Sequence, residues 1–361
     1  MRVGSPKEIK NNENRIGLTP DSVKALIGDG HEVFIETGAG EGIGCLDSFY
    51  EEVGADIVSL EDLYKNSELI IKVKEPARQE HKLLNSNHTL FTYLHLAGDK
   101  ELTLSLAKTG LTAIAYETVT SDKVHLPLLS PMSKIAGQLA FVVGSYNLLS
   151  QNQGIGKLLG FDSQFDSGTV TIVGAGTAGV QSLIMAKRNN AKINVIDVSE
   201  DKLNELKKSF GEENIQYIKS SEDTILEAVA ETDLLIGAVH VLGKSAPKII
   251  TQEMIKEMPS GSVFVDISID QGGCGQTSKP TTHDEPTYLT HDVIHYCVTN
   301  MPGSVPITST FALNKATLPY VRLIAEKGLE EAFILDEGLQ EGLNIKNGKV
   351  VHKSVIESLG L

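Results

Sequence analysis

Cysteine is scarce in this chain of 361 residues: Cys45, Cys274 and Cys297 form no CxxC motif and have no metal-ligand spacing. Their odd number argues against a framework of disulfides. We therefore expect all three thiols to be reduced and non-catalytic. We expect no metal ion either, and a metal role for His240 is disfavoured because no second ligand lies at suitable spacing.

The sequence also lacks apolar segments that target or anchor a chain. Residues 1–20 are polar and charged, without the apolar run of a signal peptide. No stretch approaches the ~20 apolar residues that span a bilayer. Basic residues are outnumbered, and the formal net charge of −15 disfavours nucleic acid and anionic membranes as partners. We expect a soluble, cytoplasmic protein whose partner is a small molecule.

What is present is a regular alternation of short β-branched segments with longer amphipathic ones, which is typical of βα units and parallel sheets. The length exceeds what one hydrophobic core usually organises, so two domains are expected. The predicted strands fall into two series, 32–36, 69–74, 89–95 and 111–116, then 169–173, 193–197, 234–238, 262–266 and 293–298. The predicted fold class is α/β, with two doubly wound Rossmann-like domains with parallel sheets, linked by long helices.

Helix signals complete this prediction. A helix at 21–27 follows Thr19-Pro20, an N-cap and a proline at the first helical position. Further helices are expected at 180–189, 201–210 and around 221–231. Two longer helices, one opened by residues 128–131 and one at about 311–326, flank the second series of strands. If these join the two domains, the chain returns afterwards to the first domain, which is then discontinuous.

The strongest motif is Gly174-Ala-Gly176-Thr-Ala-Gly179, directly after one predicted strand and directly before a helical pattern. In a G-x-G-x-x-G loop the three glycines serve the tight turn, the approach of the backbone to a pyrophosphate and the close helix–strand packing. The next predicted strand ends in Asp197, at about the 20-residue distance expected for a ribose-binding carboxylate. A glycine turn that only packs tightly is the weaker alternative.

Asp197 also predicts the cofactor. A carboxylate accepts hydrogen bonds from a ribose 2′-hydroxyl and repels a 2′-phosphate. No arginine follows it, and the nearest base, Lys202, lies in the next helix. The sequence therefore favours NAD over NADP.

A dehydrogenase also needs side chains that bind the substrate and move a proton. Lys74 follows a predicted strand, and Lys72 is the competing choice. Arg15 lies in a polar loop and would suit a carboxylate. His95 ends a strand, and imidazole is the usual side chain for proton transfer near neutral pH. Asp270 follows another strand. Each of these residues also has a purely structural reading at this point. The lysines and Arg15 could simply be solvated at the surface, His95 could be a buried structural histidine, and Asp270 could be an ordinary turn residue.

The order of motifs along the whole chain resembles bacterial L-alanine dehydrogenases, of the alanine dehydrogenase and transhydrogenase N-terminal family. The matching motifs are Met1-Arg-Val-Gly4, Pro6-Lys-Glu8, Asn11-Asn-Glu13, Lys72-Val-Lys74-Glu-Pro76, Leu94-His95-Leu-Ala97, Ala115-Tyr-Glu117-Thr-Val119, Pro131-Met-Ser133, the Gly174–Gly179 loop, Ala246-Pro-Lys248, Asp266-Ile-Ser-Ile-Asp270-Gln-Gly-Gly273, Pro280-Thr-Thr282 and Asn300-Met-Pro302.

The resemblance implies a cytoplasmic oxidoreductase that carries out reversible NAD-dependent oxidative deamination of L-alanine to pyruvate and ammonium. It implies a substrate domain of residues 1–128 and 307–361, an NAD-binding Rossmann domain of residues 129–306, and a homohexamer. The implied site residues are Arg15 and Lys74 on the substrate, His95 as general acid/base with Asp270 as its partner, and Ser133, Asp197 and Asn300 on NAD.

Alternative functions remain at this stage. One is the NAD(H)-binding component of a proton-translocating transhydrogenase, whose pattern lacks the acid that Asp270 supplies. Others are a dehydrogenase for another amino acid and a non-catalytic NAD sensor. The chain departs from the family pattern at Lys134, His240, Leu242 and Ile307. The resemblance also implies a cation at Glu117 in some relatives, and we expect none here.

Overall fold

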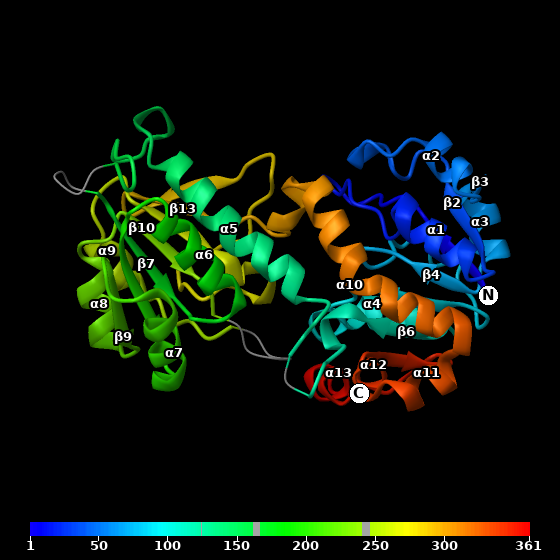
Figure 1. The fold of residues 1–361 in the computed structure, drawn as a ribbon. Coiled ribbons are helices and arrows are strands. Elements are labelled where there is room, and N and C mark those ends of the chain that lie inside the picture. The colour runs from blue at the N-terminus through cyan, green and yellow to red at the C-terminus, as the bar shows by residue number, and fades with distance from the viewer. Residues whose placement is uncertain (124, 162–166, 240–245) are drawn as a thin grey trace. The chain divides into compact units, whose positions relative to one another are not determined.

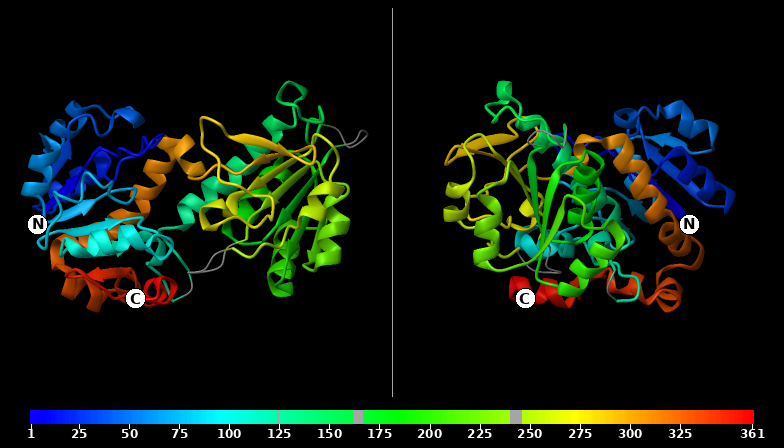
Figure 2. Two further views of the ribbon diagram at one scale, coloured as in Figure 1. Left: turned by 180° about the vertical axis from the view of Figure 1, so that it is seen from behind. Right: turned by 60° about the vertical axis from the view of Figure 1, so that its left-hand side comes forward.

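The computed structural model describes residues 1–123, 125–161, 167–239 and 246–361. The chain divides into two compact units, shown in Figures 1 and 2. Unit 1 consists of Met1–Met132 and Val305–Leu361, and unit 2 of Ser133–Ser304. Each unit contains one sheet with flanking helices (Figure 1), and no helix among the described residues is long and apolar enough to cross a membrane.

Unit 1 contains an eight-stranded sheet in the order β15-β14-β6-β5-β4-β1-β2-β3. All neighbours from β6 to β3 are parallel, whereas β14 pairs antiparallel with both β6 and β15. The strands are β1 (Arg2–Ser5), β2 (Glu32–Glu36), β3 (Asp56–Val58), β4 (Leu69–Ile71), β5 (Thr89–Thr92), β6 (Thr112–Ala115), β14 (Leu343–Lys346) and β15 (Lys349–Val350). The last segment of the chain therefore extends a sheet that the first segment begins.

The helices of unit 1 include α1, whose start follows the predicted capping pattern: the Thr19 side chain accepts the N–H of Ser22, and Pro20 is the first helical residue. The helices are α1 (Pro20–Gly28), α2 (Asp47–Glu52), α3 (Leu60–Asn66), α4 (Lys100–Lys108), α10 (Pro306–Lys327), α11 (Leu329–Leu335), α12 (Glu337–Glu341) and α13 (Lys353–Leu359). The predicted start of α10 at residue 311 was too late, because Pro306 occupies the first turn.

Unit 2 contains a seven-stranded sheet in the order β12-β13-β11-β10-β7-β8-β9, parallel except for β12. Its strands are β7 (Thr169–Val173), β8 (Lys192–Asp197), β9 (Ile215–Lys219), β10 (Leu234–Gly237), β11 (Val263–Asp266), β12 (Thr287–Thr290) and β13 (Val293–Tyr296). Its helices are α6 (Thr177–Arg188), α7 (Glu200–Phe210), α8 (Glu222–Val229) and α9 (Gln252–Glu257). Helix α5 (Ser130–Asn147) contains the boundary between the units.

The strand order of unit 2 reverses beside β7: the chain winds outward through β8 and β9, then returns to β10 on the other side of β7. In a doubly wound sheet, ligands bind at this switch point, outside the carboxyl ends of the strands. The glycine loop follows β7 directly, so the sequence motif and the topology indicate the same place.

Both faces of the central strands β7, β10 and β11 are buried, which explains why these strands read as continuous apolar runs. On β7, Val170 and Ile172 pack into one hydrophobic cluster together with residues of α5 and α6, whereas Val173 packs into another. That second cluster includes Ile225 of α8 and Met254 of α9. Helices α5 and α6 thus cover one face of the sheet and α8 and α9 the other, as in a doubly wound α/β fold.

The predicted α/β class with two Rossmann-like sheets is confirmed, and two details of it were wrong. Both sheets are mixed rather than wholly parallel, because short antiparallel strands extend one edge of each. The strands predicted at 69–74 and 89–95 end early, at Ile71 and Thr92. Beyond those residues the chain leaves the ladder and forms the loops that carry Lys74 and His95.

Candidate active site

In unit 1, four adjacent parallel strands, β6, β5, β4 and β1, end at the same edge of the sheet. The segment after β1 carries Arg15, the segment after β4 carries Lys74, and the segment after β5 carries His95. Glu117 follows β6. The topology therefore brings the three predicted substrate-side residues to one edge, although they are far apart in the sequence.

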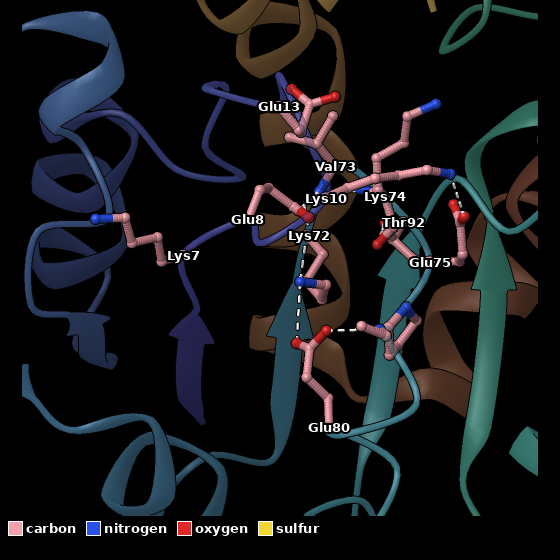
Figure 3. A network of polar contacts seen from close by, with 12 residues as sticks. Lys7, Glu8, Lys10, Glu13, Lys72, Val73, Lys74, Glu75, Glu80 and Thr92 are labelled. Carbon is pink, nitrogen blue, oxygen red and sulfur yellow. Dashed lines mark hydrogen bonds and ion pairs between the residues drawn. The ribbon is translucent and has the colours of Figure 1, made fainter. Parts of the chain in front are cut away.

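The structure separates the roles of Lys72 and Lys74. Lys72 is fully buried, and its Nζ forms ion pairs with Glu8 at 3.2 Å and Glu80 at 3.1 Å. Figure 3 shows the Lys74 side chain extending away from these carboxylates. Its backbone N–H donates to Glu8, and its carbonyl accepts the hydroxyl of Thr92 at 3.0 Å. Lys72 is a buried structural lysine, and Lys74 is the candidate for binding.

The reading of Arg15 as a surface arginine is wrong, since only 2% of it is exposed. Glu13 accepts from its Nε at 2.7 Å and its Nη2 at 2.5 Å, and Nη1 donates to the sulfur of Met132 at 3.2 Å. Burial disfavours the charged guanidinium, but the hydrogen bonds and charge of Glu13 outweigh this, so the pKa of Arg15 is raised. The planar pair fixes a permanent cation at this edge.

His95 is exposed and adopts the left-handed conformation, with φ at 50°. Both oxygens of the Glu117 carboxylate accept the N–H of Leu94, and Oε1 also accepts the N–H of His95 at 2.6 Å. The ring of Tyr93 stacks on the imidazole, with centroids 6.0 Å apart and an interplanar angle of 6°. An accessible imidazole on a backbone fixed from two sides suits proton transfer.

In unit 2, the glycine loop has the geometry expected of a phosphate-binding turn. Gly174 has φ at 109°, and a Cβ there would lie 2.4 Å from the carbonyl oxygen of Ala238. A Cβ on Gly179 would lie 1.8 Å from the carbonyl oxygen of Gly174. A Cβ on Gly176, the N-cap of α6, would meet no atom of the described residues within 4 Å. Two glycines are thus needed for packing, and the third leaves the helix N-terminus open to an anion.

Asp197 ends β8 beside this loop. Its Oδ2 accepts the N–H of Ala175 at 2.7 Å, and its Oδ1 accepts the N–H of Ser199 at 2.8 Å. The carboxylate is thereby fixed next to the glycine turn, with 9% of the residue exposed. A ribose hydroxyl at this point would find an oriented acceptor, as the fingerprint requires.

Asp270 and Asn300 lie together in unit 2. Asp270 is exposed in a 3₁₀ helix over Ile267–Gln271, and its Oδ1 accepts the backbone N–H of Asn300 at 3.2 Å. The buried Asp266 fixes the following turn by accepting the N–H of Cys274 at 2.8 Å. This pair of candidate residues is therefore supported by a buried carboxylate that the sequence reading did not single out.

Ser133 is half-buried on α5. About one helical turn further along, Gly137 packs so closely on α6 that a Cβ would lie 2.1 Å from the carbonyl oxygen of Ala178. The Ser182 hydroxyl also donates to the carbonyl of Gly137 at 2.8 Å. Ser133 thus lies near the beginning of α6, where the glycine loop ends.

Of the positions that depart from the family pattern, Lys134 and Ile307 lie among the described residues. His240 and Leu242 lie outside the described residues. Lys134 is exposed on α5, and Ile307 is exposed in the first turn of α10. No group of three potential metal ligands occurs among the residues described. The three cysteines are buried and form no disulfide: Cys45, Cys274 and Cys297.

Sequence reasoning missed Glu8 and Glu13 as partners of the candidate cations, and Tyr93 as the ring that stacks on His95. Two of them stood inside the quoted motifs Pro6-Lys-Glu8 and Asn11-Asn-Glu13. Glu13 lies two residues before Arg15, which was an available signal. Glu8 lies far from Lys74 in the sequence, and their contact depends on strand order.

These features define an α/β protein of the dinucleotide-binding class. Unit 2 carries the glycine loop, and unit 1 presents two cations and an imidazole at one edge of its sheet. The family model described as alanine dehydrogenase/PNT, N-terminal domain, matches residues 4–136, and the corresponding C-terminal domain model matches residues 140–353. The chain belongs to the alanine dehydrogenase/PNT family. The predicted resemblance is confirmed.

Full-length relatives agree with this assignment. The chain is 48% identical over 362 residues to an alanine dehydrogenase of Staphylococcus haemolyticus, covering 100% of this chain and 97% of the relative. It is 45% identical to an alanine dehydrogenase of Halomonas elongata, with the same coverage. A solved L-alanine dehydrogenase matches with a TM-score of 0.95 and 45% identity, covering 100% of this chain and 99% of that chain.

A transhydrogenase structure from Sinorhizobium meliloti matches with a TM-score of 0.84 and 24% identity, covering 97% of this chain and 100% of that chain. At this identity the likeness shows the fold alone. A transhydrogenase component, which was one of the alternatives from the sequence, therefore has the same fold as this chain. The relatives with higher sequence identity are alanine dehydrogenases.

Proposed function

We propose that this protein is an NAD-dependent L-alanine dehydrogenase, catalysing the reversible oxidative deamination of L-alanine to pyruvate and ammonium. The observation that carries the proposal is the presence of Arg15, Lys74 and His95 at one sheet edge, in a chain matched over its full length by alanine dehydrogenases. A protein that only held a dinucleotide would not need that combination of charges.

The glycine loop of unit 2 fits NAD. Gly176 leaves room at the N-terminus of α6 for a pyrophosphate, and Asp197 provides a fixed acceptor for the ribose. Ser133 and Asn300 are the further side chains assigned to the cofactor. NAD, when bound, supplies the acceptor for the hydride that leaves the substrate Cα. The carboxylate of Asp197 disfavours the 2′-phosphate of NADP.

Arg15 and Lys74 bind the substrate in this proposal, and both would orient its carboxylate or oxo oxygen. Glu13 fixes the plane of the Arg15 guanidinium, and the contacts of Glu8 and Thr92 fix the backbone of Lys74. Two fixed cations define one orientation of a small amino acid, which places its Cα–H for transfer. The gain is mainly one of positioning.

His95 and Asp270 move protons in this proposal. Loss of hydride from the amino acid leaves an imine, to which water adds with proton transfer to His95. His95 returns that proton to the nitrogen of the resulting carbinolamine. The C–N bond then breaks, ammonia leaves, and the hydroxyl proton is released to form the carbonyl of pyruvate. Asp270 assists by orienting the water. An exposed imidazole that solvent and substrate can reach suits both proton transfers.

We further propose a cytoplasmic homo-oligomer, a hexamer by family resemblance. Its substrate domain consists of residues 1–128 and 307–361, and its NAD-binding domain of residues 129–306. Exposed apolar side chains on α5, Val142 and Tyr146, support self-association. A hexamer has a mass six times the 38.9 kDa of one chain, which light scattering after gel filtration measures directly.

The decisive experiment follows NADH formation with L-alanine, L-serine and L-lysine, each with NAD and with NADP. We expect L-alanine with NAD to be strongly preferred. Turnover of a larger amino acid in preference to alanine would indicate a different dehydrogenase. No turnover of any amino acid, together with tight NADH binding, would favour the transhydrogenase or sensing alternatives.

A further inference from the structure

We propose that Glu8 is the positioning residue for Lys74: its buried carboxylate fixes the chain where β4 ends and thereby sets the direction from which Lys74 reaches the substrate. The inference rests on the proposed function, in which Lys74 binds the substrate. It concerns a buried residue that acts on the substrate through Lys74.

The contact is made at the first two residues beyond the regular hydrogen bonding of β4. Lys72 still donates its N–H to the carbonyl of Phe91, at 3.2 Å. Glu8 Oε1 then accepts the N–H of Val73 at 2.6 Å and that of Lys74 at 3.1 Å. Glu8 thus replaces the neighbouring strand as acceptor, and it does so from the segment that follows β1 (Figure 3).

The other side of the Lys74 backbone is held as well. The Thr92 hydroxyl donates to the Lys74 carbonyl at 3.0 Å, and Tyr93 donates its N–H to the Val73 carbonyl at 3.3 Å. The peptide groups before and after the Lys74 Cα are therefore fixed by Glu8 and by Thr92. The direction of the Cα–Cβ bond follows from those two constraints.

Glu8 is itself held by a buried charge network. Its Oε2 pairs with Lys72, and Lys72 also pairs with Glu80, whose carboxylate accepts the Tyr64 hydroxyl at 2.8 Å and the Ala77 N–H at 2.7 Å. Burial disfavours the charged ammonium of Lys72, but the two carboxylates outweigh it and raise its pKa. Burial also raises the pKa of Glu8, opposed by Lys72 and by the two N–H groups.

A network of this kind is a poor source of stability. Removing charges from water costs several kcal/mol per ion, and apolar replacements of buried ion pairs are often neutral or stabilising. What the network does supply is a single geometry at the end of β4. Figure 3 shows the Lys74 side chain extending from this strand exit away from Glu8 and Glu80.

The chemistry of a Glu8→Gln variant makes the inference testable. One Glu8 oxygen faces two N–H donors, and the other faces the Lys72 ammonium, so both must be acceptors. An amide has one acceptor and one donor end, and either orientation sets a donor against a donor. Replacing Lys72 by methionine removes one of those donors. In the double variant Glu8→Gln with Lys72→Met, the amide oxygen of the glutamine can therefore again accept the N–H groups of Val73 and Lys74.

The experiment compares steady-state kinetics of the full-length variants with those of the wild type. Glu8→Gln is expected to raise KM for L-alanine and pyruvate by about tenfold or more, because small displacements of a positioning group are costly. KM for NAD is expected not to change. The double variant is expected to recover most of the loss in affinity. Glu68→Gln is the matched control, since Glu68 accepts the Arg2 N–H at 3.0 Å at the opposite end of the same sheet.

The variant Glu8→Asp and amide hydrogen exchange test the same inference in two further ways. Glu8→Asp keeps the charge but withdraws the carboxylate from the loop, and it gives the same test if Glu8→Gln does not fold. Amide hydrogen exchange at Val73 and Lys74 is expected to be faster in both variants. A folded Glu8→Gln or Glu8→Asp protein with unchanged KM for L-alanine overturns the inference. Absence of turnover in the wild type overturns instead the proposed function on which it rests.

Discussion

The Oε1 atom of Glu117 accepts the backbone N–H of His95 at 2.6 Å. The acid follows β6 and the imidazole follows β5, the neighbouring parallel strand. The contact holds His95 in the left-handed region, φ 50°, which is uncommon for a residue other than glycine. The relation repeats that between Glu8 and Lys74: in each case a glutamate from the next strand exit accepts the N–H of a proposed site residue.

Loss of the Glu117 carboxylate should therefore reduce kcat through the imidazole. In Glu117→Ala, Leu94 and His95 lose their acceptor, and the left-handed conformation, which costs on the order of 1 kcal/mol or more, loses its support. We expect kcat to fall by about tenfold to a hundredfold, with a smaller change in KM for NAD. Glu101→Ala, an exposed acid on α4, is the control and should behave as the wild type. An unchanged kcat in folded Glu117→Ala would contradict the relation.

Removal of the imidazole itself should be more severe. We expect His95→Ala to reduce the rate of NADH formation by about 10²-fold or more, the usual contribution of a positioned acid/base. KM for NAD should be little affected, because the change lies in unit 1. His125→Ala removes another exposed imidazole of unit 1 as the control. Undiminished turnover after the His95 change would assign the proton transfer to another group.

The glycines of the nucleotide loop should separate stability from cofactor binding. Gly179→Ala places a Cβ within 1.8 Å of the Gly174 carbonyl oxygen and should lower the free energy of unfolding by about 1–3 kcal/mol, as overpacking does. Gly176→Ala meets no atom within 4 Å among the described residues. It should leave stability nearly unchanged but weaken NADH binding. Urea unfolding and NADH fluorescence titration measure the two effects, and equal destabilisation by both changes would contradict the reading of the loop.

The Asp197 carboxylate should determine the choice of cofactor. Hydrogen bonds to a charged group contribute about 1.5–3 kcal/mol, so Asp197→Asn should raise KM for NAD by about tenfold or more. The preference for NAD over NADP should narrow as well, because the repulsion of a 2′-phosphate is lost. Asp201→Asn, an exposed acid at the start of α7, is the control. Both cofactors would be measured at saturating L-alanine, and a preference that does not change would place the selectivity elsewhere.

Acid should destabilise unit 2 through His295. The ring is fully buried, contacts the carbonyl of Val293 and the hydroxyl of Thr277, and packs against Phe264 and Tyr288. Burial lowers the pKa of His295 below its ordinary value of 6.5. The unfolded chain therefore binds the proton first. The stability that this neutral ring contributes is complete above pH 6.5 and is lost as the pH falls toward the lowered pKa.

The corresponding experiment is urea unfolding at pH 7.5 and pH 5.5. The free energy of unfolding changes by about 1.4 kcal/mol for each tenfold change in proton affinity between the folded and unfolded states. His295→Phe keeps an aromatic ring but cannot titrate. The variant is expected to be less stable at pH 7.5 and to lose less stability on acidification than the wild type. Equal losses in both proteins would show that the proton binds elsewhere.

Much of unit 2 could be predicted because its signals are local. The run from β7 through the three glycines to α6 and on to Asp197 lies within one βαβ segment, and the structure places the loop and the acid in contact. The capping of α1 by Thr19 is equally local. Short strands such as β1 and β3 were missed because three or four residues give too little periodicity to distinguish a strand from a loop.

The side chains of unit 1 could not be assigned in the same way. Lys72 and Lys74 have the same strand parity, and their different roles depend on Glu8 and Glu80, which lie elsewhere in the sequence. The burial of Arg15 depends on Glu13 and Met132. The pairing of Glu8 with Lys72 joins the segments beyond β1 and β4, so it is set by the order of strands in the sheet. Local pattern carries no information about that order.

Strand β14 pairs with β6 on the side away from β5, and β15 extends the sheet beyond β14. In the sequence, the whole of unit 2 lies between β6 and β14. During synthesis, β6 leaves the ribosome long before its partner does, and an open strand edge is prone to join other chains. Unit 2 is contiguous and can fold in the interval. The newly made chain must therefore keep one sheet incomplete and unaggregated until β14 and β15 have been translated.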